Sequence, residues 1–163
     1  MKSCGPVPFI SPWLYRLAVR RLARRVTAGD IPAVRELAAI FCTSPDPRVS
    51  TLAGKGLCSL SSPEQADTLC QEVLLRDNPA LLALAQECRY FPSAPAERAL
   101  WLFCNAGPSE LQPDPQNYLP LLADGYTEAS VPIRARARDA ARVNGTSCIL
   151  ARALAGPNVT KYT

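Results

Sequence analysis

Residues 46–95 read DPRVSTLAGKGLCSLSSPEQADTLCQEVLLRDNPALLALAQECRYFPSAP and contain a series of four prolines at positions 47, 63, 79 and 95, each sixteen residues after the one before it. A fifth proline lies fifteen residues before the first of them. Proline suits the first turn of a helix, where its missing N–H would have no intrahelical partner, and it breaks helices elsewhere. We call these five regularly spaced prolines the proline ladder. The ladder predicts five helix starts, at Pro32, Pro47, Pro63, Pro79 and Pro95.

Side-chain acceptors precede three of these prolines. Asp46, Ser62 and Asn78 can each cap the exposed N–H groups of the helix that follows, whereas Ala94 cannot. A sixteen-residue step holds about three helical turns and a short loop, so we expect consecutive helices to double back on one another.

Alternate steps of the ladder share one apolar pattern. Counted from Pro47 and Pro79, the matched pairs are Val49 with Leu81, Leu52 with Leu84, Ala53 with Ala85, and Gly56 with Cys88. The helix between has another stripe, formed by Ala66, Leu69, Cys70, Val73 and Leu74. Such a two-helix unit of 32 residues predicts an all-α fold, a right-handed α-solenoid of antiparallel helix pairs, with about four pairs in the chain.

We expect an irregular arm over residues 1–12, one helical-repeat domain over residues 13–155 and a polar tail over residues 156–163. Three prolines and a glycine predict a longer loop at residues 107–115. The expected helices are 13–28, 32–42, 47–60, 63–76, 79–91, 95–105, 116–129, 132–143 and 147–155. The apolar face expected for the first helix comprises Leu14, Leu17, Ala18, Leu22 and Val26.

Composition and the first residues indicate a cytoplasmic protein. Hydrophobic residues make up 48% of the chain and charged residues 20%, as in ordinary globular proteins, and no apolar run reaches the roughly 20 residues of a membrane-spanning helix. The apolar stretch at residues 7–14 is short, broken by proline and followed by arginines, which does not fit a secretory signal. The absence of acidic residues before Asp30 leaves an organellar transit peptide as an alternative.

Seven cysteines and no histidine argue against a metal site. No two cysteines form a Cys-x-x-Cys pair, so the short ligand spacings of structural zinc sites are missing. Cys70 and Cys88 fall on apolar stripes, which predicts buried, reduced thiols of a cytosolic protein. Two glycosylation sequons, at residues 144–146 and 158–160, point the other way.

Catalytic patterns are also weak. Without histidine, nucleophile pairs of the Ser-His or Cys-His kind cannot form. Glu64 and Asp67 belong to a first helical turn, where the helix dipole favours acidic residues. The segment AGKGL at residues 53–57 resembles a phosphate loop, but Val49 replaces its first glycine and Gly56 its Ser or Thr. We expect no enzyme activity and no cofactor.

Charge is concentrated at the two ends of the chain. Residues 1–29 hold six basic and no acidic side chains, residues 30–129 six and thirteen, and residues 130–163 six and one. In the expected first helix, Arg16, Arg20 and Arg24 stand at i, i+4 and i+8, with Arg21 and Arg25 beside them. In the helix expected at 132–143, three arginines at the same spacing share one face, and Arg136 points away from it. The candidate partner-binding residues are therefore Arg16, Arg20, Arg21, Arg24, Arg25, Arg134, Arg138 and Arg142.

Three kinds of partner suit these arginines. The first is the acidic middle of the chain itself, or solvent; the second is an acidic surface of another protein or domain; the third is nucleic acid or anionic lipid. Basic helices at residues 16–25 and 134–142 on one side of the stack would favour nucleic acid. The aromatic residues Tyr90, Phe91 and Trp101, by contrast, predict packing between consecutive helices, and Tyr118 and Tyr126 the same across the longer loop.

Residues 77–145 resemble the HEAT-like helical region of large bacterial proteins that also carry WD-repeat propellers, some of them related to NLR-type signalling proteins. The resemblance lies in ECRYFP at 87–92 and PAERALWLF at 95–103, followed by DP at 114–115, LL at 121–122, Tyr126, Ala129, RAR at 134–136, AAR at 140–142 and Gly145. The connection NAGP at 105–108 departs from the aromatic-containing turn of that family. The resemblance implies a scaffold or interaction module without catalytic residues, in bacterial signalling or defence. An accessory subunit of a cofactor-attaching enzyme is a further alternative.

Overall fold

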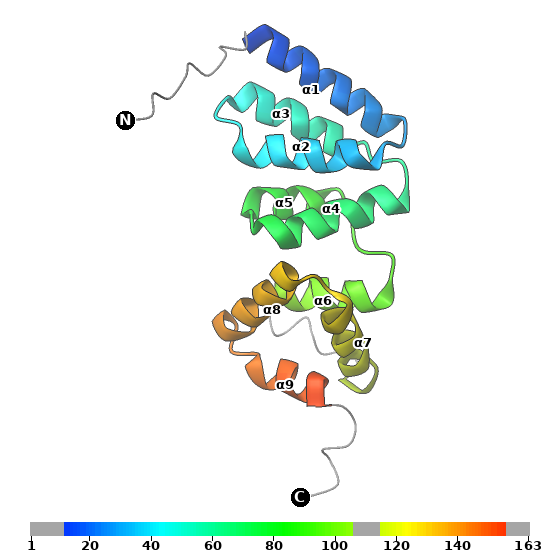
Figure 1. The fold of residues 1–163 in the computed structure, drawn as a ribbon, viewed down its shortest axis with the longest axis vertical. Helices are drawn as coiled ribbons and strands as arrows, with labels where there is room; N and C mark the ends of the chain where they lie inside the picture. Colours follow the sequence, from blue (N-terminus) through cyan, green and yellow to red (C-terminus); the bar gives the residue numbers. More distant parts are fainter. Residues whose placement is uncertain (1–11, 106–114, 156–163) are drawn as a thin grey trace, which may run out of the picture. The chain divides into compact units, whose positions relative to one another are not determined.

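The computed structural model describes residues 12–105 and 115–155, which form nine helices and no strand (Figure 1). The prediction of an all-α fold is therefore confirmed. The expected tail at 156–163 lies outside the described residues, as do the expected arm (1–12) up to residue 11 and the expected loop (107–115) up to residue 114. Pro12 and Pro115, which were expected outside the helices, begin the helices Pro12–Thr27 and Pro115–Glu128. The chain divides into two compact units, Met1–Ser61 and Ser62–Thr163, and the expected single domain over residues 13–155 stays a prediction.

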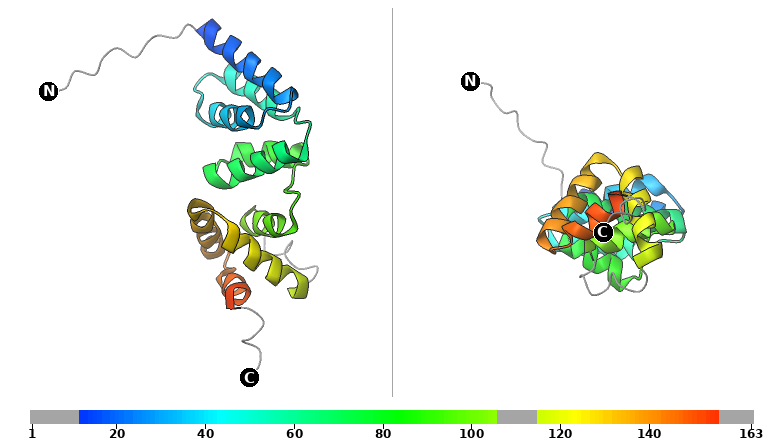
Figure 2. Two further views of the ribbon diagram at one scale, coloured as in Figure 1. Left: turned by 45° about the vertical axis from the view of Figure 1, so that its right-hand side comes forward. Right: turned by 90° about the horizontal axis from the view of Figure 1, so that it is seen from below.

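The first unit holds three helices, each in contact with the other two. They are α1 (Pro12–Thr27), α2 (Ile31–Thr43) and α3 (Pro47–Leu57). The turned views show α1, in blue, beside α2 and α3, in cyan (Figure 2).

The second unit holds six helices around a continuous apolar core. They are α4 (Pro63–Arg76), α5 (Pro79–Glu87), α6 (Pro95–Asn105), α7 (Pro115–Glu128), α8 (Val131–Val143) and α9 (Ser147–Ala155). Helix α6 packs on α7 and α8, α4 contacts α5, α6 and α8, and α9 contacts α7 and α8. Trp101, Phe103 and Leu122 are the largest fully buried side chains of the core cluster.

The predicted capping residues begin their helices as expected. Asp46 and Asn78 each accept a hydrogen bond at 2.9 Å from the backbone N–H two residues on, and Ser62 accepts one at 3.3 Å from the N–H of Gln65. Helices α2 and α8 begin one residue before their prolines, at Ile31 and Val131. The second helical residue also lacks an intrahelical acceptor for its N–H, so proline fits there too.

Helices α1 and α7 end one residue earlier than predicted, and two helices end several residues earlier, α3 at Leu57 and α5 at Glu87. At the end of α5, Arg89 adopts a left-handed conformation with φ of 56°. The Tyr90 N–H donates to the carbonyl of Ala85 at 2.9 Å, and the Arg89 N–H donates to that of Gln86 at 3.0 Å. These two bonds form a Schellman motif, which usually places glycine where Arg89 stands and is therefore hard to foresee from this sequence.

Burial is the same at three of the four matched pairs of positions; at the fourth, Gly56 is buried, whereas Cys88 is half-buried and follows the last residue of α5. Val49 and Leu81 are both buried, as are Ala53 and Ala85, while Leu52 and Leu84 are both half-buried. In α4, four of the five residues of the predicted stripe are buried, namely Leu69, Cys70, Val73 and Leu74. The sequence pattern therefore identified the buried faces of these helices.

The apolar face predicted for α1 is wrong at its N-terminal half. Leu14 is 51% exposed and Ala18 is exposed, whereas Val19 and Val26 are fully buried. The helix is turned by close packing against α3: a Cβ at Gly56 would lie 3.0 Å from the Cβ of Ala23. Val19, Ala23 and Val26 share one face, so this contact directs both valines inward.

Aromatic side chains pack between helices of the second unit, as predicted. The rings of Phe91 and Trp101 meet edge to face, with centroids 5.4 Å apart. The hydroxyl of Tyr118 donates to the carbonyl of Ala99 at 2.9 Å, which fixes α7 against α6. Trp101 is buried in the core, whereas Phe91 lies in the connection between α5 and α6 and is 41% exposed.

Candidate binding surface on α1 and α3

The arginines of α1 divide into two groups. Arg16 is half-buried and its Nη2 lies 3.1 Å from Oδ2 of Asp46; the Nε of Arg25 lies 2.7 Å from Oδ2 of Asp30. Both arginines are thus paired with acidic side chains of their own unit, which agrees with the first kind of partner considered above. The other three, Arg20, Arg21 and Arg24, are exposed and form no ion pair within the described residues.

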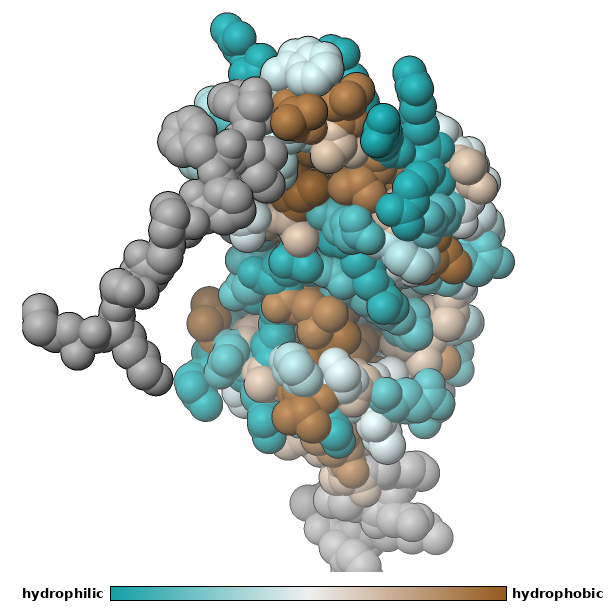
Figure 3. Space-filling model, turned by 45° about the horizontal axis from the view of Figure 1, so that its top comes forward, coloured by the Kyte–Doolittle hydropathy of each residue, from teal (hydrophilic) through white to brown (hydrophobic). Residues whose placement is uncertain are grey.

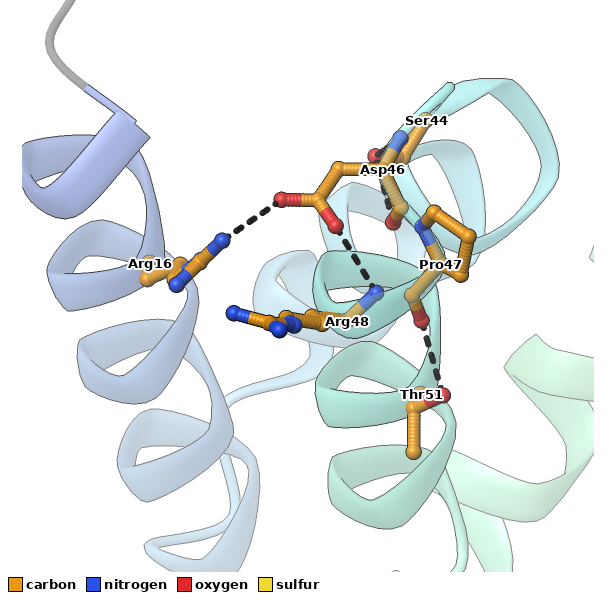
Figure 4. A network of polar contacts seen from close by, with 6 residues as sticks. All are labelled: Arg16, Ser44, Asp46, Pro47, Arg48 and Thr51. Atoms are coloured by element: carbon orange, nitrogen blue, oxygen red, sulfur yellow. Dashed lines mark hydrogen bonds and ion pairs between the residues drawn. The ribbon is translucent and has the colours of Figure 1, made fainter.

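Asp46 links the N-terminus of α3 to α1 (Figure 4). One carboxylate oxygen accepts from the Arg48 N–H at 2.9 Å, and the other accepts from Arg16. The hydrogen bond from the Arg48 backbone and that from the Arg16 side chain hold the pKa of Asp46 below its usual value. Asp46 is therefore a charged helix cap that also orients Arg16, and Arg16 is partly engaged before any ligand arrives.

Helix α3 contributes two cations that the sequence analysis did not single out, Arg48 and Lys55. Both are exposed, and the side chain of Arg48 extends toward α1 beside Arg16 (Figure 4). Arg48, Leu52 and Lys55 follow i, i+4, i+7 spacing and so share one helix face. That spacing could have identified the pair, but only the contact between α1 and α3 places them beside the arginines of α1.

An open groove runs between the two helices, and we call it the α1–α3 groove. Its lining residues are Ala23, Arg24, Thr27, Leu52, Lys55, Gly56 and Ser59. With a volume of about 220 Å³, it is smaller than the roughly 300 Å³ at which small-molecule pockets begin. Apolar surface is exposed between hydrophilic side chains on the part of the molecule that carries α1 (Figure 3).

The hydroxyl groups of the groove are already used as donors. Thr27 Oγ1 donates to the carbonyl of Arg24, and Ser59 Oγ donates to that of Gly56, both at 2.8 Å. The polar donors left for a ligand are therefore the cationic groups of Arg24 and Lys55. Cationic groups of this kind suit carboxylates and phosphates as ligands.

The second predicted arginine cluster lies on α8, in the other compact unit. Arg138 and Arg142 are exposed and Arg134 is half-buried; Arg142 lies 3.6 Å from Asp139. Arg136 forms an ion pair with Asp77 at the end of α4, which confirms that it points away from the cluster. The candidate arginines thus belong to two units, and the groove concerns only the first.

The cysteines that the structure describes do not belong to a metal-binding cluster. Burial raises the pKa of the Cys70 and Cys104 thiols to about 12, so both stay protonated at neutral pH, while Cys88 is half-buried. Among the residues that the structure describes, no group of three or more acidic, cysteine or histidine side chains could hold a metal ion. None of the helices in the described ranges combines the length and apolar character needed to cross a membrane.

Comparison with known proteins leaves the family open. The chain matches no family model, no curated protein and no solved structure. The resemblance of residues 77–145 to HEAT-like repeats therefore stays a prediction that rests on the quoted motifs.

Proposed function

We propose that this chain is a non-enzymatic helical-repeat scaffold that binds another protein, or another domain of a larger chain, through the basic face of α1 and α3. The proposed arrangement is a right-handed, HEAT-like solenoid of antiparallel helix pairs. Equal burial at three of the four matched pairs of positions in α3 and α5 supports it, because a repeat places equivalent side chains in equivalent surroundings. Solenoids present extended surfaces for partners, in keeping with a shallow groove.

The charge of the first unit is the observation that carries the proposal. Residues 1–61 contain nine basic and three acidic side chains, a net charge of +6. Two of the three acids, Asp30 and Asp46, are engaged by Arg25 and Arg16. Five further basic residues are exposed on α1 and α3, namely Arg20, Arg21, Arg24, Arg48 and Lys55. A complementary acidic surface would neutralise their charge and speed association.

The proposed setting is the cytoplasm, in bacterial signalling or defence assemblies, as the resemblance implies. Nucleic acid is the second candidate partner, because α1 and α3 are in contact and each carries exposed cations that could contact phosphates. The two partners differ in what they require. Nucleic-acid affinity falls steeply with salt and depends on every phosphate contact, whereas a protein partner also uses apolar contacts.

A binding comparison tests the proposal. The full chain is titrated at low salt against a labelled polyglutamate peptide, single-stranded RNA and duplex DNA, together with a triple variant, Arg20→Gln, Arg21→Gln and Arg24→Gln. We expect peptide binding to be lost in this variant and kept in a charge-matched control, Arg35→Gln, Arg89→Gln and Arg152→Gln, whose residues are exposed elsewhere. Binding to nucleic acid with no binding to the peptide would overturn the proposal.

A further inference from the structure

We infer that the α1–α3 groove recognises an acidic segment of a partner protein that carries one bulky apolar side chain between its carboxylates. The apolar side chain lies on the floor of the groove, and the carboxylates bind Arg24 and Lys55 on its two walls. This inference rests on the proposed function and names the chemistry of the partner.

The floor of the groove is apolar and fixed in shape. It consists of Ala23 from α1, with Leu52 and Gly56 from α3. Gly56 packs closely against its neighbours, because a Cβ there would lie 2.9 Å from Cδ1 of the buried Leu37 and 3.0 Å from the Cβ of Ala23. The floor is therefore a preformed apolar surface, and at about 220 Å³ the groove has room for roughly one large aliphatic side chain.

The walls of the groove provide one cation from each helix. Arg24 belongs to α1 and Lys55 to α3, and neither forms an ion pair within the described part of the chain. Because both are donors only, they select acceptor groups on the ligand. In a segment with a carboxylate on each side of an apolar side chain, the carboxylates would pair with Arg24 and Lys55 and the apolar side chain would cover the floor.

The combination of floor and walls separates this ligand from the alternatives. A phosphate backbone would engage the two cations but leave Leu52 and Ala23 exposed to water. An apolar helix without acidic residues would cover the floor but would bury Arg24 and Lys55 without partners, at a desolvation cost. Only an acidic segment with an apolar residue matches both features of the groove.

Two labelled peptides test the inference from the ligand side. Both have the same number of glutamates; one carries a central leucine and the other a central serine. We expect the leucine peptide to bind the full chain about tenfold more tightly, because its side chain leaves water for the apolar floor. This comparison does not depend on whether a variant protein folds.

Single substitutions test the walls. Arg24→Gln and Lys55→Gln should each weaken the leucine peptide by about threefold, as expected for a solvent-exposed ion pair. Arg21→Gln and Arg35→Gln remove the same charge from α1 and α2 outside the groove and should change affinity less.

The results distinguish failure of the proposed groove ligand from failure of the proposed protein-binding function. Equal affinity for the leucine and serine peptides, with binding still lost in the triple α1 variant, would overturn the groove and leave the protein-binding function standing. The groove would also be contradicted if Arg21→Gln and Arg24→Gln weakened the leucine peptide equally. If neither peptide binds and RNA or DNA does, the proposed function itself fails.

Discussion

At the scale of single residues, two residues other than glycine adopt the left-handed backbone conformation that favours glycine. Within the described residues these are Asp77, with φ of 48°, and Arg89, with φ of 56°. Asp77 follows α4 and is held by its ion pair with Arg136, whereas Arg89 is exposed at the end of α5 with no such contact. Arg89 is therefore the clearer case of local strain in a helix terminus.

Replacing Arg89 with glycine should stabilise the protein. A left-handed conformation costs a residue with a Cβ roughly 1–2 kcal/mol, and glycine offsets part of this gain through its greater freedom in the unfolded chain. We expect Arg89→Gly to raise the free energy of unfolding by about 0.5–1 kcal/mol in urea denaturation. Arg89→Ala, which removes the side chain but keeps the strain, should change it by less than about 0.5 kcal/mol. Destabilisation by glycine would contradict the assignment of strain.

Asp46 makes stability depend on pH. Its pKa is lowered in the folded state by the Arg48 N–H and by Arg16, so its contribution is present above the unfolded pKa and is lost as pH falls through the folded pKa. Asp46→Asn keeps a side-chain cap but removes the charge. We expect this variant to lose less stability than the wild type on acidification below about pH 5, measured as urea midpoints.

The control for this experiment is Asp124→Asn, which changes an exposed carboxylate that forms no ion pair among the described residues. Its acid profile should stay parallel to that of the wild type. Parallel profiles for Asp46→Asn as well would show that the Asp46–Arg16 contact contributes nothing to folding.

At the scale of helices, glycines set the distance between neighbours. A Cβ at Gly125 in α7 would clash with the backbone carbonyl oxygen of Ala96 in α6, whereas one at Gly56 would lie 2.9 Å from the flexible end of Leu37 and 3.0 Å from the Cβ of Ala23. The backbone of α6 cannot move aside as a leucine methyl can. The two glycines therefore differ in how much a methyl group costs.

Alanine substitutions should rank these two contacts. Alanine gains up to about 1 kcal/mol over glycine inside a helix, but overpacking against backbone costs about 1–3 kcal/mol or more. We expect Gly125→Ala to lower the free energy of unfolding by about 2 kcal/mol, and Gly56→Ala to change it by about 1 kcal/mol or less. A larger loss for Gly56→Ala would show that the α1–α3 contact is the more rigid of the two.

Helix starts were easier to predict from the sequence than helix ends or faces. A start depends on a cap and a proline next to each other in the chain, as at Asp46–Pro47, so local residues determine it. The end of α5 depends on a left-handed arginine, and the orientation of α1 depends on the fit of Ala23 to Gly56. The pattern of residues within one helix does not show how much backbone strain its end tolerates or which neighbouring helix it packs against.

The candidate site could be predicted to a similar extent. Five arginines on one short helix are visible in the sequence, but which of them are free is not. Asp30 and Asp46 engage Arg25 and Arg16, and α3 adds Arg48 and Lys55. These pairings come from helices that meet only in the folded unit.

At the scale of the whole molecule, charge is divided between the two compact units. The first has a net charge of +6, and the second has nine basic and eleven acidic side chains, a net charge of −2. The overall charge of +4 therefore understates how basic the first unit is. A scaffold of this kind would recruit acidic partners through one unit, while the second contributes further surface.

Hydrogen–deuterium exchange of the full chain, with and without a saturating glutamate-flanked leucine peptide, is a direct test of whether the peptide binds in the α1–α3 groove. Bound peptide should slow amide exchange in α1 and α3, whose contact forms the groove. We expect protection confined to peptides from Pro12–Thr27 and Pro47–Leu57. Protection centred on α8, or none at saturation, would contradict it.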